Sequence, residues 1–101
     1  MACRRIDLRE RQWTPGAHPL ERKKGPEGKM VLLELGPGFE DPNVCQRSHV
    51  IYVLEGSLEL VLDHGVERAE AGEVLLVDAG TTHRAANRGS VPVVAFVVSD
   101  V

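Results

Sequence analysis

The stretch from Gly72 to Asn87 decides the fold, and it reads Gly72-Glu-Val-Leu-Leu-Val-Asp78-Ala-Gly80-Thr-Thr-His83-Arg-Ala-Ala-Asn87. Its apolar run, Val74 to Val77, has the length of a strand and is bounded on both sides by turn-forming residues. The spacing therefore predicts a pair of short strands punctuated by glycine, with His83 presented at the end of the pair.

Short apolar runs of the same kind recur along the chain at intervals of about ten residues, a pattern typical of antiparallel sandwiches and barrels. The predicted strands are Met30 to Leu35, Val50 to Leu54, Leu58 to Asp63, Glu67 to Glu70, Val74 to Val77 and Pro92 to Val98. No window has a helical period, because Pro or Gly interrupts almost every candidate. The sequence thus predicts an all-β antiparallel fold, for which a jelly-roll barrel is one solution that limits exposed strand edges.

The Gly72 to Asn87 stretch resembles the second sequence motif of the cupin superfamily, in which a Gly, a Pro, a Gly, a His and an Asn recur at these intervals. Four of the five positions match, and Asp78 stands where the proline is usual. The first cupin motif closes with a glycine, and Tyr52-Val-Leu-Glu-Gly56 lies at the expected distance upstream. The resemblance spans roughly residues 31 to 98 and implies a cupin jelly-roll barrel.

The first motif is altered at the positions where cupins carry their metal ligands. His49 occupies the place of the family's glutamate, Cys45 that of its second histidine and Asn43 that of its first. The resemblance implies that His83 reaches the same interior from the second motif. We therefore predict Cys45, His49 and His83 as metal ligands, with Asn43 as a pocket residue or fourth ligand.

Convergence of these residues requires a reversal of the chain. Residues four apart on an extended strand are separated by about 13 Å, so Cys45 and His49 cannot share a metal on one straight strand. The cupin pattern places a tight connection at Gln46-Arg47-Ser48. Asn43 and Cys45 have the same parity, so both are expected to face the interior.

A thiolate and two imidazoles favour zinc over the hard-ligand metals manganese and magnesium. Zinc is accordingly the first expectation for the cofactor, and the resemblance leaves nickel and iron(II) open. We expect a small-molecule ligand in the barrel. The sequence selects neither a reaction nor a catalytic residue, so whether the protein is an enzyme stays open.

Three alternatives stand beside a small metalloenzyme. The altered motif allows a degenerate, metal-free cupin in which Cys45 is only a small buried thiol. It also allows a non-catalytic sensor or binding module, or a thiol enzyme with Cys45 as nucleophile and a histidine as base.

The chain has 101 residues and a net charge of −3, which predicts one domain and argues against a nucleic-acid partner. Residues 1–29 carry turn formers and many charges, so we expect a leader that packs on a barrel formed by residues 30–101, with Trp13 covering one side. No stretch is apolar enough to span a membrane and the first residues lack a signal-peptide core, which predicts a cytoplasmic protein with two free thiols, Cys3 and Cys45.

A homodimer is expected from the two faces of the strand that begins near Val50. Tyr52 and Leu54 lie on one face of this strand, and Ile51 and Val53 on the other. Because both faces are apolar, one of them is expected to be covered by a second copy.

Overall fold

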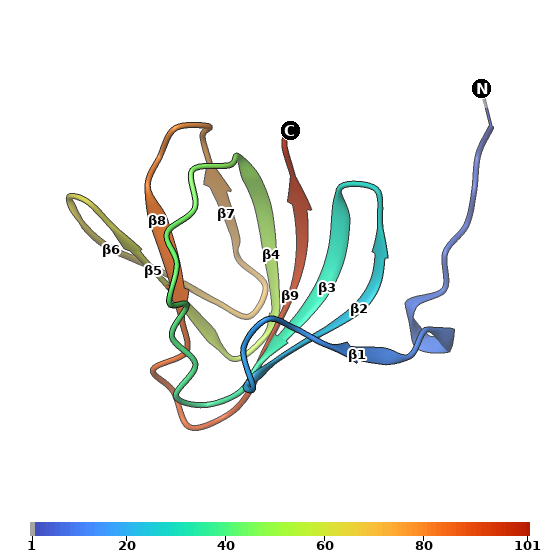
Figure 1. The fold of residues 1–101 in the computed structure, drawn as a ribbon, viewed down its shortest axis with the longest axis horizontal. Helices are drawn as coiled ribbons and strands as arrows, with labels where there is room; N and C mark the ends of the chain where they lie inside the picture. Colours follow the sequence, from blue (N-terminus) through green and yellow to red (C-terminus); the bar gives the residue numbers. More distant parts are fainter. Residues whose placement is uncertain (1) are drawn as a thin grey trace.

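The computed structural model describes residues 2–101 and arranges them in two antiparallel β-sheets (Figure 1). The strands are β1 (Trp13–Pro15), β2 (Glu21–Glu27), β3 (Met30–Leu35), β4 (His49–Glu55), β5 (Ser57–Leu62), β6 (Gly65–Glu70), β7 (Val74–Val77), β8 (His83–Ala86) and β9 (Val93–Ser99). One sheet has the order β1-β2-β3-β9-β4-β7 and the other has the order β6-β5-β8. Within residues 2–101 the only helical segment is a 3₁₀ turn, Leu8–Glu10. The predicted all-β antiparallel fold is confirmed.

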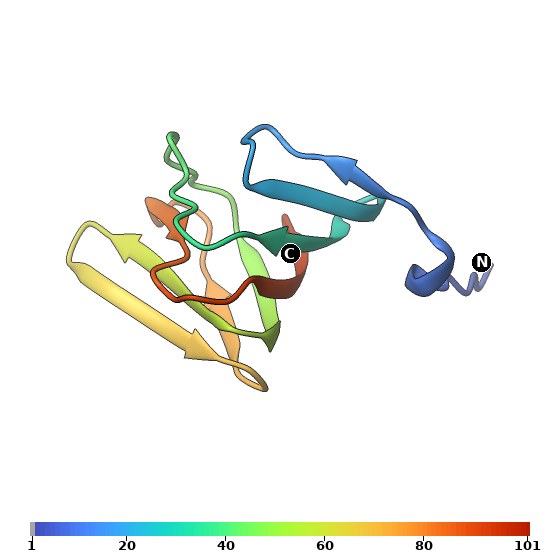
Figure 2. The same cartoon turned by 90° about the horizontal axis from the view of Figure 1, so that it is seen from below.

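The core lies between the two sheets, which face each other in Figure 2. The residues of strand β9 alternate between buried and half-buried from Val93 to Ser99, so every second side chain points into this core. Leu58 and Leu60 of β5 fill the interior from the opposite sheet. The residues along the inner faces thus form one apolar core, into which the site opens.

Gly56 and Asn87, the last residues of the two sequence motifs, have structural roles. Gly56 has a φ of +78°, and a Cβ on it would lie 2.6 Å from the carbonyl oxygen of Pro92. The side chain of Asn87 is buried, donates to the carbonyl oxygens of Leu35 and Val91, and accepts from the N–H of Gly89. It therefore fixes the loop between β8 and β9 against the end of β3.

Part of the predicted leader joins the larger sheet. Strand β2 pairs with β3 along its length, and β1 pairs with β2 at the edge, whereas the segment before β1 extends away from the sheets (Figure 1). Trp13 is half-buried on this edge, with the guanidinium of Arg22 4.5 Å and the ammonium of Lys24 5.2 Å from its ring centre. Residue 1, the first of the predicted leader, lies outside the described residues.

No helix in residues 2–101 has the length and apolar character that a membrane crossing requires.

Candidate metal centre

Backbone pairing brings Cys45 and His83 side by side although they are distant in sequence. The N–H of Cys45 donates to the carbonyl of His83 at 2.9 Å, and the N–H of His83 donates back at 3.0 Å. The chain then bends at Arg47, within the predicted reversal, before His49 opens β4. This bend turns His49 back toward the side chain of Cys45.

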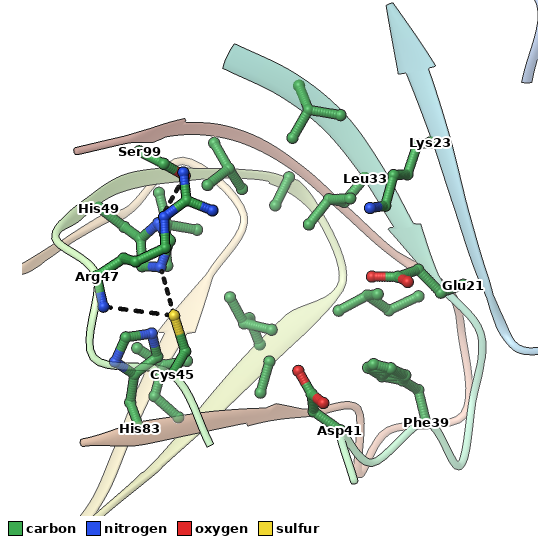
Figure 3. A pocket seen from close by; sticks show the side chains of 18 residues that line it. Glu21, Lys23, Leu33, Phe39, Asp41, Cys45, Arg47, His49, His83 and Ser99 are labelled. Atoms are coloured by element: carbon green, nitrogen blue, oxygen red, sulfur yellow. Dashed lines mark hydrogen bonds between the residues drawn. The ribbon is translucent and has the colours of Figure 1, made fainter. Parts of the chain in front are cut away.

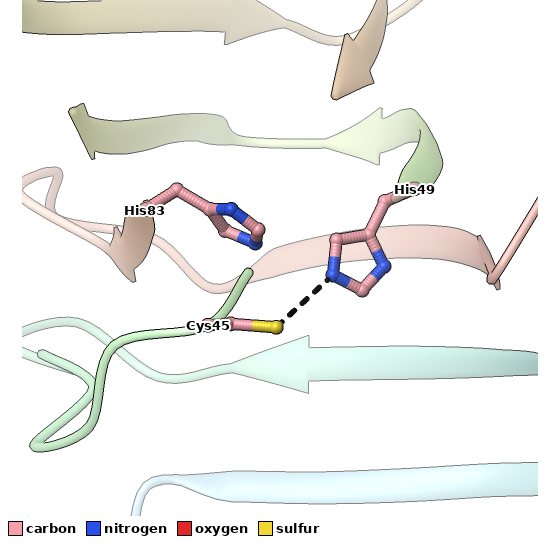
Figure 4. A group of neighbouring side chains, drawn as sticks. All are labelled: Cys45, His49 and His83. Carbon is pink, nitrogen blue, oxygen red and sulfur yellow. Dashed lines mark hydrogen bonds between the residues drawn. The ribbon is translucent and has the colours of Figure 1, made fainter. Parts of the chain in front are cut away.

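The three side chains point toward one another (Figure 4). One donor atom from each of Cys45, His49 and His83 lies within 4.8 Å of the other two. The Sγ of Cys45 is 3.5 Å from Nε2 of His49. A tetrahedral zinc with bonds of about 2.3 Å to sulfur and about 2.0 Å to nitrogen separates those donors by about 3.5 Å. The measured separation therefore suits a shared tetrahedral metal.

Both imidazoles are held through the nitrogen that faces away from the group. Nδ1 of His83 lies 2.8 Å from the carbonyl oxygen of Thr81, which can only accept, so Nδ1 carries the proton. Nδ1 of His49 lies 2.9 Å from the hydroxyl oxygen of Ser99. In metal sites such outer contacts orient the ring and leave the other nitrogen free to coordinate. The pattern here leaves Nε2 of each ring available.

The surroundings of His49 favour its neutral form. Burial lowers the pKa of His49 below its ordinary value of 6.5, and the neighbouring His83 and Arg47 lower it further. Cys45 Sγ also accepts the N–H of Arg47 at 3.4 Å. A metal binds a neutral imidazole and a thiolate, so a neutral His49 ring is ready to coordinate and only the thiol of Cys45 must lose its proton.

Hydrogen bonds of Asp100 hold the end of β9 next to Cys45, His49 and His83. Asp100 is the only non-glycine residue in the described chain with a positive φ, 57°, a conformation that costs about 1 kcal/mol. Its carboxylate accepts two hydrogen bonds from Arg47, its N–H donates to Ser48, and its carbonyl accepts from Lys29. These contacts hold the preceding Ser99 in place against His49.

The group lies at one end of a cavity of about 270 Å³ inside the barrel (Figure 3). The middle of the cavity is lined by apolar side chains of both sheets: Val31, Leu33, Leu35, Ile51, Leu58, Leu60, Ala85, Ala95 and Val97. A ligand inside it would contact these apolar side chains and would meet Cys45, His49 and His83 at its end.

Asn43, the predicted fourth ligand, is placed differently. It is exposed, does not line this cavity, and borders a neighbouring surface hollow. Of the remaining candidates, Cys3 is exposed and His64 lies in the exposed turn between β5 and β6. His18 packs edge-on against Phe39, with ring centres 5.0 Å apart.

Sequence reasoning missed Ser99 and the backbone carbonyl of Thr81. A signal for Ser99 exists, because it has the same parity as the core residues Val93, Ala95 and Val97. Its partner could not be found without the register, in which His49 pairs directly with Ser99.

Comparison with known proteins identifies the family. A cupin-domain family profile matches residues 31–99, and no curated protein matches the sequence. Similar solved structures include the polyketide cyclase RemF from Streptomyces resistomycificus, 24% identical with a TM-score of 0.80, covering 97% of this chain and 79% of that one. A sugar phosphate isomerase from a cupin superfamily, from Silicibacter pomeroyi, is 21% identical with a TM-score of 0.76, covering 97% and 76%.

A predicted oxalate decarboxylase from Thermotoga maritima is 16% identical with a TM-score of 0.78, covering 97% of this chain and 99% of that one. At these identities the structural likeness establishes the fold alone. The family match covers more than half of the chain and agrees with both sequence motifs and with the two-sheet barrel. The chain therefore belongs to the cupin family.

Proposed function

We propose that this protein is a small-molecule-binding cupin that holds one divalent metal through Cys45, His49 and His83. The observation that carries the proposal is the donor arrangement: three ligand atoms lie within 4.8 Å of one another, and each imidazole is held through its other nitrogen. Random loss of a metal site would not be expected to keep these outer contacts.

Zinc is the metal that best suits this donor set. A thiolate and imidazoles favour zinc, with nickel and iron(II) next, over magnesium or manganese. Three protein ligands are typical of catalytic zinc sites, in which the fourth position takes water or substrate. Asn43 is not needed for that position, because the group opens onto the cavity.

The metal would supply Lewis-acid chemistry at the end of the cavity, because zinc and one thiolate leave a net charge of about +1 there. The chain's own residues would orient and desolvate the ligand. Ser99 and the carbonyl of Thr81 hold the two rings, and the apolar walls exclude water from the bound molecule.

Metal analysis of protein purified without a nickel column tests this proposal. We expect about one zinc per chain after zinc addition and dialysis, and loss of that zinc in Cys45→Ser and in His83→Ala. The matched controls are Cys3→Ser and His64→Ala, both at exposed positions, together with Asn43→Ala. All three should keep the metal. Wild-type protein that takes up no metal would replace the proposal with the metal-free cupin.

A second candidate function is thiol chemistry at Cys45. The observation that favours it is the 3.5 Å contact between Sγ and Nε2 of His49, the arrangement of a nucleophile beside its base. The two functions differ in their response to zinc. If Cys45 is a ligand, zinc should protect it from alkylation by iodoacetamide, whereas a thiol enzyme should react with iodoacetamide rapidly and lose no activity on treatment with chelator.

We further propose that a second copy of the chain covers the outer face of the larger sheet. Exposed apolar side chains gather on β4 and β7, where 76% of Leu76, 50% of Val74, 44% of Leu54 and 41% of Tyr52 is accessible. The face continues through the half-buried Phe96, which pairs with Tyr52 in the sheet. Contiguous groups of exposed apolar side chains are typical of protein interfaces.

A further inference from the structure

The end of the cavity away from Cys45, His49 and His83 is charged. Glu21 and Lys23 reach it from β2, and Asp41 reaches it from the loop after β3 (Figure 3). All three side chains are half-buried and belong to the cavity wall, next to the buried ring of Phe39. The apolar interior therefore lies between the candidate metal centre and a group of both charge signs.

The alternation of β2 puts these charges inside the barrel. Glu21 and Lys23 share one face of the strand, and Lys23 pairs with Leu33, another residue of the cavity wall. Arg22 and Lys24 face the opposite way, where Arg22 binds the carboxylate of Glu34 and both cations lie over Trp13. Among the charges of β2, Arg22 and Glu27 form ion pairs and Lys24 lies over the ring of Trp13, whereas the inward Glu21 and Lys23 have neither kind of contact.

Within residues 2–101, no oppositely charged group lies within 4.0 Å of the charged atoms of Glu21, Lys23 or Asp41. Each carboxylate accepts one backbone N–H: Glu21 from Ala17 and Asp41 from Asn43, both at 2.9 Å. Two carboxylates and one ammonium thus border the cavity, and each can form further hydrogen bonds; the same three residues also border the neighbouring surface hollow. Their complement is a ligand group that carries a positive and a negative charge side by side.

The dimensions limit the ligand to a small molecule. Lys23 pairs with Leu33, which pairs with Ala95, and Ala95 lies four residues from Ser99 on β9. Four strand rises therefore separate the backbones of Lys23 and Ser99 by about 13 Å along the sheet. The long side chain of Lys23 can shorten the distance between its ammonium group and the metal centre. The volume of about 270 Å³ is just below the roughly 300 Å³ at which ligand pockets usually begin.

We propose that this end of the cavity binds the zwitterionic head group of a free α-amino acid with an apolar side chain. The ligand's ammonium group binds Glu21 and Asp41, and its carboxylate binds Lys23. Its side chain lies against the apolar walls and points toward Cys45, His49 and His83. This assignment rests on the proposed small-molecule function of the cavity, although the head-group contacts do not involve the metal.

Isothermal titration calorimetry with three matched probes tests the assignment: L-leucine, isoamylamine, which lacks its carboxylate, and isocaproate, which lacks its amine. L-leucine should bind about tenfold more tightly than either analogue, the effect of one additional charge-assisted hydrogen bond. The titrations are made on zinc-loaded and on chelator-treated protein, and the preference should be present in both.

Variants on the two faces of β2 assign the contacts. Lys23→Met should weaken L-leucine and isocaproate about tenfold and leave isoamylamine unchanged. Glu21→Gln and Asp41→Asn should weaken L-leucine and isoamylamine and spare isocaproate. The controls are Lys24→Met, on the opposite face, and Glu67→Gln, an exposed residue of β6. Circular dichroism verifies that each variant is folded.

Failure of this inference is distinct from failure of the metal proposal. The assignment is wrong if either analogue binds as tightly as L-leucine, or if Lys23→Met binds the three probes as Lys24→Met does. The inward charges would then have no role in ligand binding. Absence of L-leucine binding to zinc-loaded protein also overturns it and leaves the metal proposal intact. If the protein takes up no zinc but still prefers L-leucine, the head-group assignment is supported and the metal proposal is wrong.

Discussion

Ser99 is the side chain that orients His49 toward Cys45 and His83. Its hydroxyl lies 2.9 Å from Nδ1 of His49, at the end of a strand locked by Asp100. Because outer contacts of this kind hold a metal ligand in position, Ser99→Ala should weaken zinc binding about tenfold. Competition with a chelating dye measures the affinity. Ser57→Ala removes a surface hydroxyl that donates to Glu70 and is the control; equal affinity of the two variants would contradict the role of Ser99.

The lowered pKa of His49 also predicts how stability depends on pH. The folded chain keeps this ring neutral to a lower pH than the unfolded chain, in which its pKa is near 6.5. The unfolded state therefore takes up the proton first, and the free energy of unfolding should fall as the pH decreases below about 6.5. Urea denaturation of chelator-treated protein measures this fall. It should be smaller in His49→Gln, and an identical pH dependence in both proteins would show that His49 does not contribute.

The residues of the candidate site differ in how far the sequence could predict them. Cys45, His49 and His83 occupy family ligand positions, so their convergence was predicted from the motif spacing, and their role as ligands stays a prediction. Ser99 and Lys23 carry no motif. Their positions depend on which strands pair and in which register, information that a single strand does not contain.

At the scale of elements, the strands with alternating or apolar patterns were predicted closely, and β3 and β7 match their predicted bounds. The ranges of strands β2 and β8 were not predicted, although a strand pair was expected between Gly72 and Asn87. Their sequences, Glu-Arg-Lys-Lys-Gly-Pro-Glu and His-Arg-Ala-Ala, lack the β-branched and aromatic residues that favour strands. They are strands because β3 and β5 offer them partners, which is a property of the sheet rather than of the segment.

The loop between β8 and β9 depends on Asn87, whose side chain is 1% exposed and makes three hydrogen bonds to backbone groups. Asn87→Ala leaves those groups without their partner and should lower the free energy of unfolding by about 3 kcal/mol. Chemical denaturation measures the change. Asn43→Ala, at an exposed position, is the matched control and should change stability by less than about 0.5 kcal/mol. Similar losses in both variants would refute the assigned role of Asn87.

At the scale of the whole molecule, the apolar outer face of β4 and β7 predicts a homodimer. Light scattering at micromolar concentration should give about twice the chain mass of 11.1 kDa. Leu76→Lys places a charge on the most exposed apolar side chain of the proposed contact and should give monomers. Val66→Lys is the control, because Val66 is also exposed but lies on β6 of the other sheet. A monomeric wild-type protein, or a dimer that Leu76→Lys leaves intact, would contradict this interface.

The central claim is that one metal is held by one sulfur and two imidazole nitrogens, and zinc X-ray absorption spectroscopy tests it most directly. The zinc-loaded protein should show one sulfur at about 2.3 Å and two imidazole nitrogens at about 2.0 Å, with a light atom completing the shell. Cys45→Ser should lose the sulfur contribution, whereas Cys3→Ser should keep it. A zinc shell without sulfur in the wild-type protein, or one that Cys45→Ser leaves unchanged, would contradict the account.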